Sequence, residues 1–592
     1  MKKEFYQQQQ QIATATKKTQ LSKSHKFTTI RTALFIGLVF AFAAGYDGHV
    51  AGTISGLLLL IAFIYAIRQH NRLKYQLELT ISRMAVINSY LARFTNDWHN
   101  LKAAGSEFRH AKRPQEIDLH ILGKASLYQY LCLAQTKLGR QKLAASLAVF
   151  PAKEQTIRDR QKAVAELINQ PSLCLDFLAL NNMLPENHDT KPLVATITNM
   201  QQYSPGSWEN RARFFLPLLT LLSLLLWLAD LTSISVPAFL FSLQLLLAVI
   251  FFNRHQQLLA PLKDFNRELN LYAALFAKFT DTDFKSARLR AMQQKLLSSP
   301  NANVSLNKLN QLADKVRMRN NIFFFVLANT LLLWDFHCTI NFLSWCQPAS
   351  KSVAKWLDLW AEFEVILSLA IVGQTRNTWT MPKILNGTPA VKANALSSLL
   401  INEKLSVAND SALTAETRII TGSNMSGKTT YMRTIASSAV LAYAGAPVCA
   451  KAFALTPLFI FTSIQVNDDL AHGISTFYAE LLRLKQIVKF SHRRLPMLIC
   501  IDEIFKGTNS ADRIVGAKEA IKHLTQPWCI TIVTTHDFEL CDLKAAGNVP
   551  ITNFHFEEYY QADKIHFDFK LKPGRCHTTN AKYLLHMAGI LD

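Results

Sequence analysis

The strongest constraint on the fold is a short glycine-bearing loop in the C-terminal third of the chain. The sequence from Gly422 to Thr429 reads G-x-x-x-x-G-K-T. The apolar run Arg418–Thr421 precedes this loop, and a helix-forming run follows it and stops at Gly445. Glycines at both ends let backbone N–H groups turn inward around a phosphate, and the positive end of the following helix adds to the attraction. The pattern predicts a strand, a phosphate-binding loop and a helix.

The loop also carries two side chains that suit a nucleoside triphosphate. We expect the ammonium group of Lys428 to reach the β- and γ-phosphates and the Thr429 hydroxyl to bind Mg²⁺. The predicted phosphate-binding residues are Gly422, Ser423, Asn424, Met425, Ser426, Gly427, Lys428, Thr429 and Thr430.

Two later apolar runs end in side chains that suit ATP hydrolysis. The run Met497–Ile504 contains Asp502, which we expect to hold Mg²⁺ through water, and Glu503, which would orient or activate the attacking water. The run Ile530–Asp537 contains His536, a candidate contact to the γ-phosphate. Taken singly, the acids could be a solvated strand end and the histidine an edge residue, but their order after the loop favours a site. Three strands with helices between them predict a mostly parallel sheet, with the ligand at its carboxyl edge.

Four segments in this order resemble the ATPase domain of MutS-type DNA mismatch-repair proteins, which belong to the ABC ATPase superfamily. The segments are TGSNMSGKTTYMR, DDLAHGISTFYAEL, IDEIFKGTNS and TTHDFEL. The resemblance is dense over 390–592 and weaker in the helical region before it, where the family has lever and clamp helices. It implies an α/β P-loop (ABC-type) ATPase domain that hydrolyses ATP to ADP and phosphate, with ATP and Mg²⁺ as cofactors.

The resemblance implies further residue roles. Ser475 matches the signature serine, which completes the ATP site of the opposite subunit, so a homodimer with composite sites closing on ATP is implied. Gln465 is similar to the loop glutamine near Mg²⁺ and the attacking water, which makes it a third candidate catalytic residue beside Glu503 and His536. Asn409 resembles the segment that helps to seat the nucleotide. The turn Lys506–Ser510 matches one that crosses the dimer interface, and AKYLLHMAGI resembles the family's closing helix.

The chain departs from the repair proteins of this family in its N-terminal half. Those proteins carry a recognition domain whose Phe-x-Glu motif stacks on the mispaired base. Residues 1–253 instead hold apolar runs and a helical segment, and we find no such domain there. The resemblance therefore implies ATP binding and hydrolysis, but it does not imply the reading of mismatches.

The apolar runs come in two pairs, each flanked by arginines and interrupted by a single acid, Asp47 or Asp230. A bilayer core needs about 20 apolar residues per helix. The second run of each pair meets that length, and the first run needs its neighbours to do so. We interpret the pairs as transmembrane helical hairpins at 28–68 and 213–253, with buried soluble hairpins as the alternative.

The charge distribution bears on both membrane and nucleic-acid partners. The chain has 64 Lys+Arg and 42 Asp+Glu, a net charge of +22. Residues from Val391 onward hold 21 basic and 18 acidic side chains, so 22 − 3 = +19 lies in 1–390. Such an excess suits DNA backbone phosphates or anionic lipid, and it also suits the cytoplasmic flanks of membrane helices. The positive-inside bias predicts an inner (cytoplasmic) membrane protein whose N-terminus and ATPase domain face the cytoplasm.

The stretch 320–350 resembles the two pairs but contains several Asn, His and Gln residues, which are costly in lipid. We therefore interpret it as buried soluble core rather than a third hairpin, within an all-α lever/core-like region. The expected organisation is a polar basic tail (1–27), hairpin 1 (28–68), a cytoplasmic helical region (69–212), hairpin 2 (213–253), a lever/core-like domain (254–389) and the ATPase domain (390–592).

Three functional interpretations remain open at this point. The chain could be a membrane-anchored dimeric ATPase that contacts the phosphate backbone of DNA. It could be a membrane mechanochemical or scaffold ATPase that binds no nucleic acid. In the third interpretation the apolar hairpins are core or dimer helices of a soluble ATPase.

Overall fold

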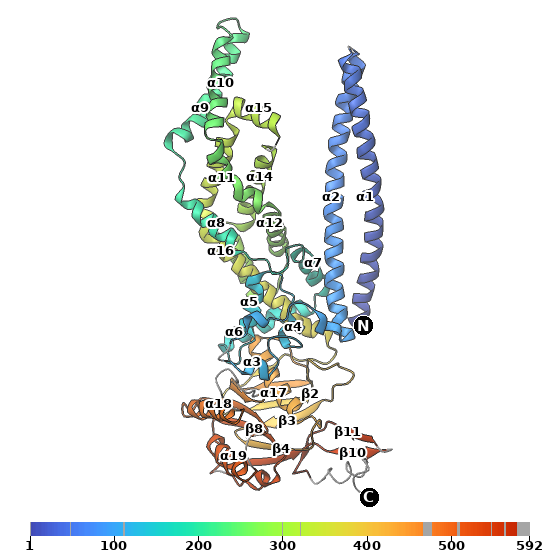
Figure 1. The fold of residues 1–592 in the computed structure, drawn as a ribbon, viewed down its shortest axis with the longest axis vertical. Helices are drawn as coiled ribbons and strands as arrows, with labels where there is room; N and C mark the ends of the chain where they lie inside the picture. Colours follow the sequence, from blue (N-terminus) through green and yellow to red (C-terminus); the bar gives the residue numbers. More distant parts are fainter. Residues whose placement is uncertain are drawn as a thin grey trace.

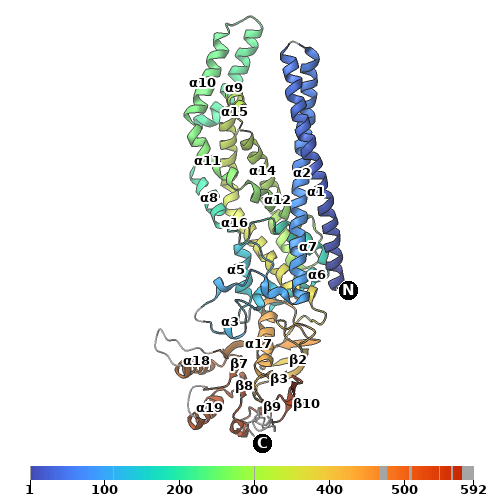
Figure 2. The same cartoon turned by 45° about the vertical axis from the view of Figure 1, so that its right-hand side comes forward.

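The structure is a computed structural model, and it describes residues 2–47, 49–110, 113–298, 300–319, 321–465, 476–505, 510–545, 547–561 and 564–576. It has an elongated helical part and an α/β part at one end (Figure 1). Two helical arms extend from the helical part, away from the α/β part, as the rotated view in Figure 2 also shows.

The first arm, here called the hairpin arm, is a pair of long antiparallel helices. They are α1 (Lys2–Tyr46) and α2 (Val50–Thr95). The base of the hairpin is packed, since Tyr6 is 1% exposed and its ring stacks on Tyr90 with centroids 4.5 Å apart. Residues 2–27, which the sequence suggests are a separate polar tail, form the first half of α1 because side chains such as Tyr6 pack against α2.

The second arm, here called the bundle arm, contains five helices and the upper part of a sixth. They are α9 (Ser207–Leu228), α10 (Ser235–Ile250), α11 (Phe252–Asp264), α14 (Ala302–Met318), α15 (Ile322–Leu332) and α16 (Trp334–Thr375).

The stretch 320–350 is divided between two of these helices. The start of α16 is buried, with Phe342 1% and Cys346 0% exposed. Helix α15 instead carries exposed apolar side chains, including Phe323 at 84%. The two helices meet at an angle of 82° because Leu333, between them, has a left-handed φ of +46°. The expectation of buried core therefore describes the start of α16 but does not describe α15.

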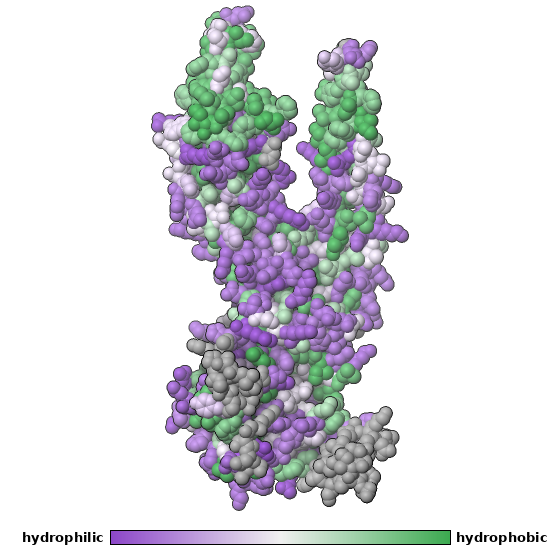
Figure 3. Space-filling model, in the orientation of Figure 1, coloured by the Kyte–Doolittle hydropathy of each residue, from purple (hydrophilic) through white to green (hydrophobic). Residues whose placement is uncertain are grey.

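Both arms carry apolar surface near their tips. Figure 3 shows hydrophobic side chains gathered there at similar height, with hydrophilic side chains below them and at the very ends of the arms. Phe40, Leu58 and Leu218 are 70%, 64% and 62% exposed there. Three helices are long and apolar enough to cross a membrane by length and composition, or up to six if each of three bent helix pairs counts as one span. The three are Lys2–Tyr46, Val50–Thr95 and Ser207–Leu228.

The arms join a base of shorter helices built around the lower half of α16. These elements are η1 (Asp97–Asn100), η2 (Ser106–Phe108), α3 (Gln115–Asp118), α4 (Leu127–Leu131), α5 (Lys137–Ser146), α6 (Glu154–Ile168), α7 (Pro171–Asn181), α8 (Lys191–Asn199), η3 (Met200–Gln202), α12 (Asn266–Asp281) and α13 (Ala287–Leu297). Aromatic rings of Phe177, Phe279 and Phe363 contact one another in its core. Glu364 of α16 is 1% exposed, and burial raises its pKa, although the side chain of Asn181 donates to its carboxylate at 2.7 Å.

The α/β part is centred on a six-stranded sheet in the order β12-β9-β4-β8-β7-β6. Every neighbouring pair is parallel except β12 with β9, so the mostly parallel sheet predicted from the sequence is present. The strands are β4 (Thr417–Thr421), β6 (Phe459–Ser463), β7 (Met497–Asp502), β8 (Cys529–Thr535), β9 (Ile551–His555) and β12 (Lys572–Pro573). The helices are α17 (Lys428–Ala444), α18 (Thr476–Ser491), α19 (Ser510–Leu524) and η5 (Phe538–Asp542).

Two smaller strand groups complete the α/β part. One is a four-stranded sheet in the order β1-β5-β2-β3, and the other is the antiparallel pair β10–β11. Their strands are β1 (Lys383–Ile384), β2 (Val391–Leu396), β3 (Asn409–Leu413), β5 (Ala452–Leu455), β10 (Glu558–Gln561) and β11 (Lys564–Phe567).

Candidate functional site

The glycine-bearing loop joins β4 to α17 at the carboxyl edge of the parallel sheet, as expected. Gly422 has φ +146°, and a Cβ atom there would lie 2.7 Å from the carbonyl oxygen of Phe556. Gly427 has φ +107° and caps the N-terminus of α17. Both positions need glycine, because a side chain would be strained at either φ and would collide with backbone at the first. The loop can therefore present backbone N–H groups and a helix N-terminus to a phosphate.

The ammonium group of Lys428 lies inside this loop. Its Nζ donates to the carbonyl oxygens of Gly422 at 2.7 Å and Ser423 at 2.8 Å. Burial lowers the pKa of Lys428, while the nearby carboxylates of Glu503 and Asp502 act in the opposite direction. The ammonium group of Lys428 is thus placed in the loop whose backbone N–H groups already favour an anion.

Asp502 and Thr429 lie side by side at the end of β7. The Thr429 hydroxyl donates to the two carboxylate oxygens of Asp502 at 3.0 and 3.1 Å, and the Thr534 hydroxyl donates to the same carboxylate. Hydroxyl and carboxylate oxygens are the ligands that Mg²⁺ prefers, usually together with phosphate and water. In the described part of the chain no three His, Cys, Asp or Glu side chains gather in a metal-binding group. The donor set therefore fits Mg²⁺, which needs only one or two protein carboxylates.

Glu503 and His536 face each other across adjacent strand ends. Nε2 of His536 lies 3.1 Å from Oε1 of Glu503 and 2.9 Å from Oδ1 of Asn424. Because the carboxylate can only accept, we assign the proton of the imidazole to Nε2. Glu503 has φ +51°, an uncommon backbone conformation for a residue with a side chain, and its side chain is 30% exposed. The carboxylate is thus held beside the loop where water can reach it.

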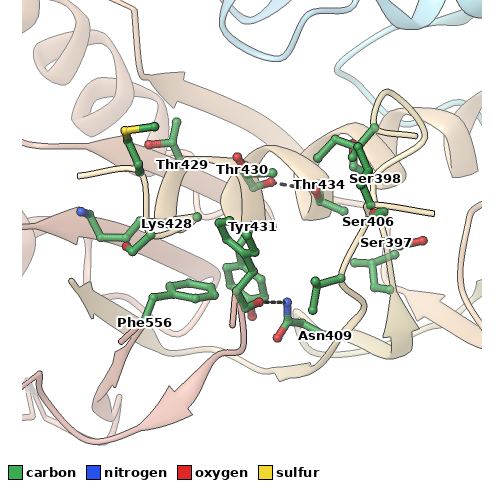
Figure 4. A pocket seen from close by; sticks show the side chains of 18 of the residues that line it. Ser397, Ser398, Ser406, Asn409, Lys428, Thr429, Thr430, Tyr431, Thr434 and Phe556 are labelled. Atoms are coloured by element: carbon green, nitrogen blue, oxygen red, sulfur yellow. Dashed lines mark hydrogen bonds between the residues drawn. The ribbon is translucent and has the colours of Figure 1, made fainter. Parts of the chain in front are cut away.

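A cavity of about 530 Å³ adjoins the loop. Figure 4 shows side chains from α17, the segment 397–409 and Phe556 around it. Asn409 lies at its edge, where its Nδ2 donates to the Phe569 carbonyl at 2.9 Å and its Oδ1 accepts from the backbone of Leu571 at 2.9 Å. Two aromatic rings, Phe556 and Phe569, also line the cavity. This space can take the base and sugar of a nucleotide whose phosphates occupy the loop.

The other predicted site residues fall into two groups. Gln465 follows the end of β6, where its side chain is exposed and its backbone N–H donates to Asp118 at 3.1 Å. Ser475, residues 506–509 and the segment 581–590 lie outside the described residues, so their roles stay predictions.

Sequence reasoning missed several residues that the structure brings to the site. Thr534 could have been found, because it lies near the end of β8, two residues before His536. Phe556 and Phe569 carry no local signal. Ser423 is also joined to Glu558 of β10, with its hydroxyl donating at 2.6 Å, and nothing in the local pattern links those two positions.

Comparisons with known proteins find similarity in this part of the chain. Residues 418–591 match the family model MutS domain V. The DNA mismatch repair protein MutS of Natronomonas pharaonis is 36% identical over 175 residues, which is 29% of this chain and 20% of that protein. MutS 2 of Haloarcula marismortui is 35% identical over 176 residues, 29% of this chain and 18% of that protein.

A third relative extends the match. DNA mismatch repair protein MutS of Streptococcus pneumoniae serotype 19F is 31% identical over 241 residues, which is 39% of this chain and 28% of that protein. The chain thus spans between 18% and 28% of the length of these three curated relatives.

Proposed function

We propose that this chain is a membrane-anchored MutS-type ATPase whose α/β part binds and hydrolyses MgATP as a homodimer. The observation that carries the proposal is the convergence of Lys428, Thr429, Asp502, Glu503 and His536 at one sheet edge. The similarity of residues 418–591 to MutS domain V supports the same function.

Each group has a distinct task in this proposal. Backbone N–H groups of the loop and the ammonium of Lys428 hold the β- and γ-phosphates, and Thr429 and Asp502 hold Mg²⁺, which neutralises phosphate charge when bound. The Glu503 carboxylate accepts a hydrogen bond from the attacking water, orients it and takes its proton as the water oxygen bonds to the γ-phosphorus. The bond between the γ-phosphorus and the β,γ-bridging oxygen breaks, and ADP leaves with that oxygen. His536 donates from Nε2 to a γ-phosphate oxygen. Gln465, at the end of the neighbouring strand β6, is the proposed second contact to the water.

The dimer is proposed on the implied role of Ser475. The serine would close the ATP site of the partner subunit, so hydrolysis would require two chains. Helix α18 begins directly after this serine, so a movement of the signature segment would also displace α18 within the α/β part.

Membrane anchoring is proposed on the apolar tips of the two arms. Both tips lie at the end of the molecule opposite the α/β part (Figures 1 and 3), so one bilayer could take both while ATP reaches the loop from water. Unpaired apolar surface of this extent on a soluble chain would be an aggregation hazard. With basic residues below both tips, the positive-inside bias places the α/β part and the N-terminus in the cytoplasm, at the inner membrane.

Two candidate functions are proposed for this ATPase. The first is DNA binding through backbone phosphates, which is proposed on the family similarity and on the basic excess outside the ATPase-like segment. The second is mechanical or scaffold work at the membrane without nucleic acid, which the apolar tips favour. These functions share the ATP site and differ only in the partner.

The partner can be tested with the detergent-purified protein. We expect Mg²⁺-dependent ATP hydrolysis, and for the DNA-directed function we expect binding to homoduplex, mismatched or branched DNA that weakens linearly with salt on logarithmic axes. Binding without preference for the mismatch would fit backbone contacts. No hydrolysis would refute the ATPase, whereas hydrolysis with no DNA affinity at low salt would leave the membrane-only function.

The membrane arrangement predicts a difference in labelling between two introduced cysteines. All nine native cysteines are buried, so they should react little with a thiol reagent added to the folded protein. Tyr46, at the turn of the hairpin arm, is 93% exposed, and Val515 of α19 is 65% exposed. In sealed right-side-out vesicles, a membrane-impermeant maleimide should label Tyr46→Cys, whereas Val515→Cys should react only after permeabilisation. Equal labelling of both before permeabilisation would refute a hairpin that crosses the bilayer.

A further inference from the structure

The helical base places one carboxylate inside the α/β part. Asp118, the last residue of α3, is 0% exposed. Its carboxylate accepts from the Thr462 hydroxyl at 2.7 Å, the Ile464 backbone at 3.2 Å and the Gln465 backbone at 3.1 Å. It also pairs with Arg483 of α18 at 3.1 Å. Four donors from two elements of the α/β part thus converge on one acid from outside it.

Three further contacts connect the helical base to the α/β part beside the Asp118 carboxylate, and the whole set is called the joint here. Arg433 of α17 donates from Nε to the Asp118 carbonyl oxygen at 2.8 Å. Strand β6 is an edge strand, and its Ile460 N–H donates to the Val149 carbonyl of the helical base at 3.1 Å. Gln115 of α3 donates to the Ile460 carbonyl at 3.4 Å. The open edge of the sheet is therefore covered by the helical base beside Asp118.

Each element that Asp118 holds leads directly to the candidate site. Strand β6 runs into Gln465, whose own N–H is one of the donors. Helix α17 carries Thr429 one turn before Arg433. Helix α18 begins beside the predicted signature segment and carries Arg483. A buried carboxyl group is costly to leave without hydrogen-bond partners, so these donors must stay together around Asp118.

The joint is also continuous with the hairpin arm. Helix α2 leads through η1, which includes the fully buried Trp98, to the segment that carries α3. Nε2 of Gln129 on α4 donates to the carbonyls of His99 and Leu101 at 3.0 and 2.5 Å, which fastens this connection to the base. A displacement of α2 relative to the sheet would therefore act on α3.

We propose that Asp118 is a positioning residue for ATP hydrolysis, which holds Gln465 and α18 in register with the phosphate loop and couples them to the hairpin arm. The inference rests on the proposed ATPase function and adds a residue outside the nucleotide site to it. Asp118 acts through its hydrogen-bond donors and touches no reacting atom in this proposal.

The substitution Asp118→Asn tests the role. The amide presents a donor where the structure offers only donors, so at least one bond to β6 or α18 is lost. We expect kcat to fall about tenfold, within the usual range for coupling between sites, while KM for ATP changes less than about twofold because the phosphate loop is intact. The control is Asp358→Asn, which removes an ion pair to Lys142 within the helical base, away from the hairpin arm, and should leave kcat unchanged.

A milder variant and a second readout cover a loss of folding. Thr462→Val removes one donor and leaves the ion pair to Arg483. Hydrogen exchange of the peptide 459–465 should be faster in both Asp118→Asn and Thr462→Val than in the wild type, and unchanged in Asp358→Asn. Folded variants with wild-type kcat and exchange would overturn the proposal, as would an equal effect of Asp358→Asn. A wild-type protein without ATPase activity would instead overturn the proposed function, and the exchange result would still report on the joint.

Discussion

Replacing Glu503 with glutamine is expected to lower the rate of ATP hydrolysis by about 10²- to 10⁴-fold, the usual contribution of a positioned general base. The amide keeps the size of the side chain and an oxygen for the His536 Nε2 proton, but it cannot take a proton from water. ATP binding should persist, because Lys428, Thr429 and Asp502 are unchanged. Steady-state turnover and a separate ATP-binding titration measure the two effects, and size-exclusion chromatography should show the ATP-bound dimer accumulating.

The control for this variant is an exposed acid in the short helix that follows the neighbouring strand, β8. Glu539 of η5 is exposed, and Glu539→Gln should turn over ATP at the wild-type rate. If Glu503→Gln hydrolyses ATP normally, Glu503 is not the water-activating acid. In that case the base must be sought among the other groups at the sheet edge.

Replacing Lys428 with alanine is expected to weaken ATP binding at least about 100-fold. Hydrogen bonds to charged groups contribute roughly 1.5–3 kcal/mol each, and the ammonium can make two of them to phosphate oxygens. The backbone of the loop would remain, since its shape depends on Gly422 and Gly427. Calorimetric or fluorescence titration with ATP gives the affinity, and hydrolysis should fall with it.

The exposed lysine of α19 provides a charge-matched comparison for this loss. Lys522 pairs with Glu519 at 2.6 Å on the surface and does not line the cavity beside the loop, so Lys522→Ala should bind ATP within about twofold of the wild type. Wild-type affinity in Lys428→Ala would show that the triphosphate does not occupy this loop.

The core of the candidate site was predictable because its signals are local. Each strand, with the polar residues at its end, is a short contiguous pattern, and parallel strands bring their carboxyl ends to one edge. Lys428, Asp502 and His536 are therefore placed together by topology alone. Asp118 was not predictable in this way. It lies 344 residues from Thr462, and no spacing within its own segment marks it as a partner of the sheet.

In the helical arms, the average polarity of a segment does not predict the environment of its individual residues. The polar residues of 320–350 suggest one buried unit, but a single left-handed residue, Leu333, divides it into a helix end with buried side chains and the exposed helix α15. The N-terminal tail is polar enough to suggest a separate segment. It is nevertheless part of the continuous helix α1, in which Tyr6 and Ala13 are buried. The role of Ser475 and the crossing of a membrane stay predictions.

The covered edge of β6 sets a limit on treating the chain as modular. The match to MutS domain V begins at residue 418, which suggests an autonomous C-terminal domain that could be excised from the helical part. The structure argues otherwise, because the backbone of Ile460 bonds to Val149 and Gln115, and Arg160 of α6 donates to the carbonyl of Ala444 at 3.0 Å. An excised 390–592 fragment would carry an unpaired strand edge open to pairing with other copies. The segment that is similar to other proteins in sequence is therefore shorter than the part of the chain that must stay together to keep the edge of β6 covered.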